Sequence, residues 1–155
     1  MMLGRRESVE GLNKLMKDIA KLEKMPQKQI TKGVRRGANV ILHEARARAP
    51  KLTGKLKRKL TLKSERSKKR GKKVMQVTFQ KVEKFPEAVK VAKDGTRYYY
   101  PASQNFGFRT RSGGYVEGKH FLDGAMQAKS GQAARVIVDE IGKEIDKALS
   151  EGKIT

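Results

Sequence analysis

The chain has 155 residues, the usual length of one domain with or without tails, and 37 Lys and Arg against 16 Asp and Glu give it a formal charge of +21. It contains no cysteine, which excludes disulfide scaffolds, thiolate zinc sites, iron–sulfur clusters and cysteine nucleophiles. Uninterrupted apolar runs, such as Val136-Ile137-Val138, are at most three residues long, so we expect no membrane span. The amino terminus predicts no secretory signal, and we expect the protein to start in a cytoplasm.

The positive charge is concentrated in one part of the chain. Residues 46–73 hold 14 Lys or Arg and a single acid, Glu65. Like charges at this density cannot pack against each other, so we expect a mobile basic loop at about 64–73. This loop is either a solvated surface or a binding surface for a polyanion or an acidic protein partner. The candidate binding residues are Lys68, Lys69, Arg70, Lys72 and Lys73.

Nucleic acid is the commonest polyanion, but motifs that read bases are missing. The chain has neither zinc-finger spacing nor an aromatic-rich RNA-binding strand. Any contact with DNA is therefore expected to reach backbone phosphates without reading sequence.

Apolar spacings of three and four residues predict two amino-terminal helices. The apolar pattern of the first extends from about Val9 to Leu22, and Pro26 ends this helix or begins the next. The second runs from about Ile30 to Ala49, ends at Pro50, and carries a basic outer face.

Alternating patterns after Pro50 predict strands. We expect a hairpin that joins residues 60–63 to residues 74–82, with the basic loop at its tip. A second hairpin is expected around the turn pair Asp94-Gly95. Residues 107–118 contain four glycines and are predicted to be a flexible loop. A long final helix follows from Phe121, with an interruption expected near Gly131.

These elements predict a single α+β domain over residues 1–155. It has two N-terminal helices, a small antiparallel β-sheet of about four strands with long loops, and a C-terminal helix packed on the sheet.

Candidates for catalysis are poor, so we expect no enzyme activity, no cofactor and no metal. His43 lies in the middle of a predicted helix and is expected at its surface or at an interface. His120 precedes the final helix, where a capping or packing role is expected. Neither histidine stands in a metal-binding or nucleophile motif.

Three short motifs in a fixed order carry a family resemblance. The first is Ala-Pro-x-x-Thr-Gly-x-Leu at the end of a helix, the second a Tyr followed by a Phe-Gly turn, and the third Phe-Leu-x-x-Ala at the start of the final helix. The residues concerned are Pro50, Thr53, Gly54, Leu56, Tyr100, Phe106, Gly107, Phe121 and Leu122. Over residues 8–150 the chain thereby resembles the tail-completion, or head–tail joining, proteins of long-tailed bacteriophages, the gene-product-ten family of lambdoid phages.

Structural roles suit these motif residues. Pro50 stops a helix, Gly54 permits a turn, and Phe121 and Leu122 anchor the final helix. Phe106 is expected to seat its ring in the core beside Gly107. The chain departs from the family where Asn105 replaces an acid and His120 a proline, and its positive charge is not a family hallmark.

The resemblance implies a structural virion protein of the phage neck, made in the host cytoplasm during assembly. It implies a homo-oligomeric ring, with a hexamer favoured, between the head connector and the tail terminator or tube proteins. DNA would pass through the ring, with possible non-specific contact, and no membrane is involved. Two alternatives stay open: a basic nucleic-acid-binding protein of ribosomal or nucleoid type, and a toxin-like or RNA-processing enzyme.

Overall fold

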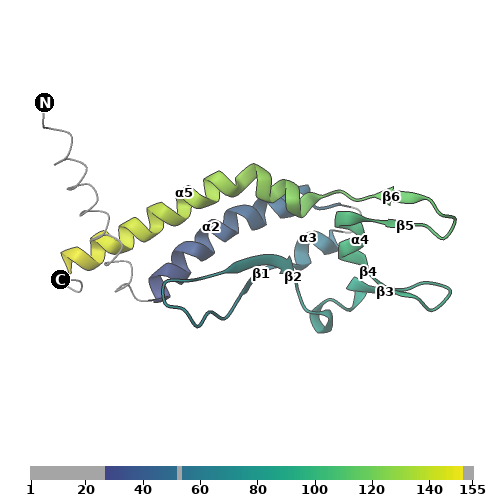
Figure 1. The fold of residues 1–155 in the computed structure, drawn as a ribbon, viewed down its shortest axis with the longest axis horizontal. Helices are drawn as coiled ribbons and strands as arrows, with labels where there is room; N and C mark the ends of the chain where they lie inside the picture. Colours follow the sequence, from purple (N-terminus) through teal and green to yellow (C-terminus); the bar gives the residue numbers. More distant parts are fainter. Residues whose placement is uncertain (1–26, 52–53, 152–155) are drawn as a thin grey trace, which may run out of the picture.

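Two long antiparallel helices form the central scaffold of the molecule. The computed structural model describes residues 27–51 and 54–151. Helix α2 (Gln27–Arg48) lies alongside helix α5 (Phe121–Ser150), whose 30 residues span about 45 Å (Figure 1). The predicted second helix and final helix are confirmed, whereas the predicted first helix lies outside the described residues.

Small residues on α2 allow the two helices to approach closely. Gly33 and Gly37 are buried, and a methyl group added at Gly37 would collide with Ile137 and come within 2.8 Å of the Ala133 carbonyl oxygen. Ridges formed by Ile137 and Ile141 therefore fill the grooves that these glycines leave. Helix α5 is continuous through Gly131, so the predicted interruption there is wrong. Gly131 is exposed on the helix surface, where the absence of a side chain weakens a helix without breaking it.

A short helix and a hairpin follow α2. Helix α3 (Lys55–Lys59) leads into strand β1 (Leu60–Ser64), which pairs with strand β2 (Met75–Phe79) in antiparallel register. The predicted hairpin with the basic loop at its tip is confirmed. Its core-facing side chains pack on the helices in one cluster of Leu42, Ala45, Ala49, Leu60, Phe121 and Ala125.

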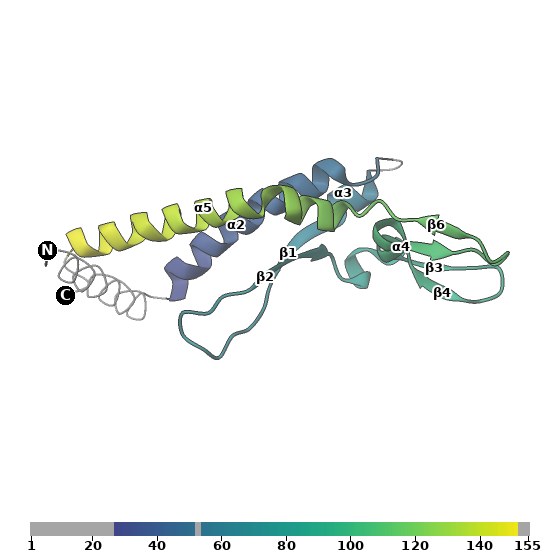
Figure 2. The ribbon, with the colours of Figure 1, turned by 45° about the horizontal axis from the view of Figure 1, so that its top comes forward.

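The remaining elements build the other end of the molecule. Two 3-10 turns, η1 (Val82–Lys84) and η2 (Pro86–Ala88), precede strands β3 (Val89–Val91) and β4 (Arg97–Tyr99). Helix α4 (Tyr100–Phe106) then leads to strands β5 (Gly107–Arg109) and β6 (Tyr115–Glu117). The second predicted hairpin is confirmed as β3–β4. The hairpins β3–β4 and β5–β6 project from the end of the molecule opposite the carboxyl end of α5 (Figures 1 and 2).

The predicted α+β class is confirmed, with two corrections of detail. Within the described residues, the strands form three separate two-stranded sheets and not one sheet of about four strands. Residues 107–118 form the hairpin β5–β6 and not a loop. Glycine supplies the left-handed backbone that the hairpin turn requires, because Gly113 has a φ of 85°. None of the helices in the described residues combines the length and the apolar composition that a membrane span requires.

Candidate functional site

The basic loop between β1 and β2, residues 65–74, is a densely charged feature of the structure, and we call it the basic arm. Four of the candidate binding residues are exposed and Lys73 is half-buried. The structure therefore places the predicted residues together at one hairpin tip, away from both apolar clusters. What they bind stays a prediction.

One side chain ties the basic arm to the start of α2. The Gly71 N–H donates to Gln27 Oε1 over 3.1 Å, and Gln27 Nε2 donates to the Lys72 carbonyl oxygen over 3.1 Å. Gly71 has a φ of 77°, which glycine adopts without strain. The arm thus has a defined attachment near its tip, which limits where its cations can lie.

The acid of the basic arm is engaged within the hairpin. The side-chain amide of Gln76 donates to the Glu65 carboxylate, and the Glu65 N–H donates to the Val74 carbonyl over 3.1 Å. Lys73 Nζ donates to the Glu65 carbonyl oxygen over 3.2 Å. Because Glu65 faces Gln76 at the base, it does not pair with the cations at the tip.

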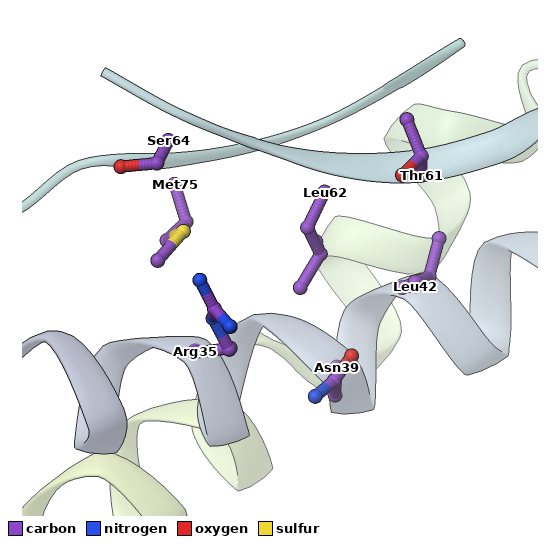
Figure 3. Close-up of a pocket in the computed structure, with 7 residues that line it drawn as sticks. All are labelled: Arg35, Asn39, Leu42, Thr61, Leu62, Ser64 and Met75. Carbon is purple, nitrogen blue, oxygen red and sulfur yellow. The ribbon is translucent and has the colours of Figure 1, made fainter. Parts of the chain in front are cut away.

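A cavity of about 310 Å³ lies between α2 and the strands β1 and β2, at the base of the basic arm (Figure 3). Arg35 rises into this space from α2 toward Met75, while Leu62 points down from β1. Among the described residues Arg35 has neither a hydrogen-bond partner nor an ion-pair partner, so it adds one cation at the base of the arm. The cavity is lined by Arg35, Asn39, Leu42, Thr61, Leu62, Ser64 and Met75. The basic face of the helix was visible in the sequence, but only the register of the hairpin over α2 shows that Arg35 belongs beside the arm.

Two other cations of α2 form ion pairs with acids of α5. Arg36 Nη1 lies 2.5 Å from Glu140 Oε2, and Lys32 Nζ lies 2.5 Å from Glu144 Oε1. The hydrogen bond and charge of Glu144 raise the pKa of Lys32, and the hydrogen bond from Lys32 lowers the pKa of Glu144. Glu140 and Glu144 of α5 therefore pair with two cations of α2, and neither acid compensates the charge of the basic arm.

The first motif makes the turn that starts the hairpin. Gly54 has a φ of +64° at the start of α3, a left-handed backbone that suits glycine. Leu56 is 2% exposed and packs with Phe85 and Ala88 in a second apolar cluster. Pro50 lies two residues beyond Arg48, the last residue of α2, whereas Thr53 lies outside the described residues.

The second motif differs from its prediction in one residue. Phe106 is 56% exposed, so the expectation that its ring sits in the core is wrong. The neighbouring Asn105 takes the buried position instead, because consecutive helical residues point about 100° apart. Tyr100 starts α4, with Lys90 Nζ 5.3 Å from its ring centroid, and Gly107 adopts a φ of 86° that starts β5.

Asn105, a residue of α4, caps the amino terminus of α5. Its Oδ1 accepts the Leu122 N–H over 3.0 Å, and its Nδ2 donates to Asp123 Oδ2 over 3.2 Å. His120 occupies the N-cap position with a φ of 44° but makes no capping hydrogen bond through its side chain. Phe121 is 1% exposed and belongs to the main apolar cluster, with Leu122 half-buried beside it. His43 is exposed on α2, as expected.

The described residues offer no metal centre: no group of three or more His, Asp or Glu side chains is placed to hold an ion. The chemistry that the arrangement supports is electrostatic binding by the basic arm and apolar contact by the two projecting hairpins.

Comparison with known protein families gives one match. The family described as "Bacteriophage HK97-gp10, putative tail-component" matches residues 13–99, more than half of the chain. The chain belongs to this family. Membership indicates a structural component of a bacteriophage virion and confirms the resemblance seen in the sequence.

The HK97-gp10-like match covers the first motif, the basic arm and the hairpin β3–β4. It ends before α4, so the second and third motifs and the whole of α5 lie beyond it. No curated protein and no solved structure matches the chain significantly.

Proposed function

We propose that this HK97-gp10-like protein is a structural protein of the phage neck that joins the DNA-filled head to the tail. Membership of a phage tail-component family carries the proposal. The motif that closes α2 at Pro50 and turns the chain at Gly54 lies within the matched residues and supports it.

In this proposal the protein acts as a homo-oligomeric ring, with six copies favoured by the resemblance. Its neighbours are the head connector and the tail terminator or tube proteins. The shape of the subunit supports assembly, because two hairpins project from a two-helix scaffold (Figure 2). Aromatic side chains of these hairpins are exposed to solvent. Apolar surface of this kind is typical of proteins that gain stability from subunit contacts.

The basic arm is proposed to face the channel through which DNA passes. Its cations lie at a hairpin tip and have no acidic partners at the tip among the described residues. Contact would be with phosphates, which suits a channel that must pass DNA of any sequence. We assign no catalytic role to the protein.

Deletion of the gene tests the proposal. Electron microscopy of the lysate should show filled heads and free tails that do not join, and a plasmid copy of the gene should restore whole particles. Normal infectious particles from a clean deletion would overturn the proposal.

The uncompensated charge of the basic arm favours a second candidate function, a basic nucleic-acid-binding protein of ribosomal or nucleoid type. That candidate predicts tight binding to nucleic acid in the host and no defect in joining. Portal, capsid and tail-tube genes beside this gene would favour the neck, and ribosomal genes would favour the alternative.

A further inference from the structure

Exposed apolar side chains are concentrated at the end of the molecule that carries the two projecting hairpins. Seven of the eleven large apolar side chains that the described residues expose lie between residues 91 and 116. They are Val91, Tyr98, Tyr99, Phe106, Phe108, Tyr115 and Val116. A patch of this density on a water-soluble surface marks an interface with another molecule.

A groove runs between the two hairpins. It encloses about 640 Å³, with α4 contributing to its wall. Tyr98 and Phe108 line it from opposite hairpins. Two basic side chains, Arg109 and Arg111, and one acidic side chain, Asp94, also line it. Residues 89–118 hold five basic and two acidic side chains, a net charge of +3. The groove therefore suits a partner surface that is apolar and acidic.

The outer face of α5 has this character. Val138 is 68% exposed and Leu149 is 39% exposed, and with Gly142 they follow an i, i+4, i+11 spacing along one stripe of the helix. Asp139 and Asp146 are exposed and seven residues apart, so they flank the same stripe. Helix α2 packs on a different, neighbouring face of α5, against Ile137 and Ile141.

The charge distribution favours this face over the rest of the chain. Residues 118–155 hold six basic and six acidic side chains, so the whole excess of +21 lies in residues 1–117. A basic groove is repelled by most of a second copy but not by α5.

We propose that the groove between the hairpins β3–β4 and β5–β6 of one copy receives the carboxyl half of α5, residues 138–149, of a second copy. This inference rests on the proposed ring. The two surfaces lie at opposite ends of the subunit, so the contact is head-to-tail and can repeat around a closed ring (Figures 1 and 2). The basic arm belongs to neither surface and stays available to DNA.

Cysteine cross-linking in assembled particles tests the contact, since the natural chain has no cysteine. Phe108→Cys and Val138→Cys in one chain should give a ladder of covalent multimers in purified virions after mild oxidation. Each substitution alone should give none, and Lys69→Cys with Val138→Cys is the matched control from the basic arm. A ladder from the first pair and none from the control supports the inference.

Other outcomes separate the inference from the proposed function. Virions that contain the protein but give no ladder overturn this contact and leave the neck assignment intact. Virions that lack the protein overturn both. Cross-linking of Val138→Cys to Met16→Cys within one chain shows that the amino-terminal segment covers the stripe, which also overturns the contact.

Charge exchange provides an independent test. Arg109→Asp with Arg111→Asp should lower the yield of joined particles by more than about tenfold, and Asp139→Arg with Asp146→Arg should do the same. The four substitutions together should restore joining, because the attraction is rebuilt with its signs exchanged. Unchanged joining in every variant, or failure of the fourfold variant to restore it, contradicts the pairing.

Discussion

The Asn105 side chain caps the backbone of Leu122, 17 residues further along the chain, with 3.0 Å between Asn105 Oδ1 and the Leu122 nitrogen. The α4 backbone completes the joint, because the Gln104 and Asn105 carbonyls accept the N–H groups of Lys119 and His120 over 2.8 and 2.9 Å. Asn105 is 1% exposed, so water cannot replace it. The joint fixes the hairpin β5–β6 and the start of α5 relative to α4.

Replacing Asn105 with Leu should lower the free energy of unfolding by about 1 to 3 kcal/mol, because the Leu122 N–H loses its acceptor in a buried place. Denaturant titration of the purified protein measures this. Gln104→Leu is the matched control on the same helix and should change stability by less than about 0.5 kcal/mol. Equal losses in the two variants would show that Asn105 is not a cap.

Replacing Gly37 with Ala should also destabilise the fold, by about 1 to 3 kcal/mol, because the new methyl group overpacks the contact between α2 and α5. Gly131→Ala adds the same methyl group to a helix where nothing lies within 4 Å. That control should gain up to about 1 kcal/mol from better helix propensity. A gain at both positions would contradict the close packing at Gly37.

The Lys32–Glu144 pair predicts a pH dependence of stability at both extremes. Because the pKa of Glu144 is lowered in the folded protein, its ionised carboxylate stabilises the fold fully when the pH is above 4.5, the ordinary pKa of Glu. This contribution is lost as the pH falls through the lowered pKa. Because the pKa of Lys32 is raised in the folded protein, its ammonium group stabilises the fold fully when the pH is below 10.5, the ordinary pKa of Lys. This contribution is lost as the pH rises through the raised pKa.

Comparison of the natural chain with Glu144→Gln measures the acidic limb of this dependence. The difference in unfolding free energy should be constant near neutral pH and shrink in strong acid. A difference that stays the same in strong acid would show that the pair does not contribute.

Replacing Lys68, Lys69, Arg70, Lys72 and Lys73 with Ser should weaken binding to duplex DNA of any sequence. Each phosphate contact that is lost should make the slope of log affinity against log salt less negative by about 0.9, because fewer counterions are released. The fold should be kept, since none of these residues belongs to either apolar cluster. Arg35→Gln, beneath the arm, should reduce the slope by about 1 at most.

If the natural chain shows no salt-dependent binding to DNA and the five-residue variant still blocks head–tail joining, the arm binds an acidic protein partner. If the variant neither changes DNA binding nor blocks joining, the arm is a solvated surface.

Local sequence patterns predicted α2, α5 and the first two hairpins. In each case an apolar period or a turn pair such as Asp94-Gly95 sets the structure locally, and tertiary packing agrees with it. The structural roles of the motif residues Gly54, Leu56 and Phe121 could be predicted for the same reason, because each depends on the local sequence around it.

Features that depend on distant parts of the chain were not predictable in this way. Asn105 acts as a cap only because α4 and α5 meet, and Arg35 lies beside the basic arm only because the hairpin folds over α2. The hairpin β5–β6 was missed because its strands are only three residues long, too short for an alternating pattern to be visible in the sequence.

An electron microscopic reconstruction of the neck in the intact virion tests the central claim most directly. The account predicts a closed ring of this protein on the particle axis, between the head connector and the tail tube, with the basic arms turned toward the DNA channel. A ring-free arrangement, a single off-axis copy, or a location away from the head–tail junction would contradict it.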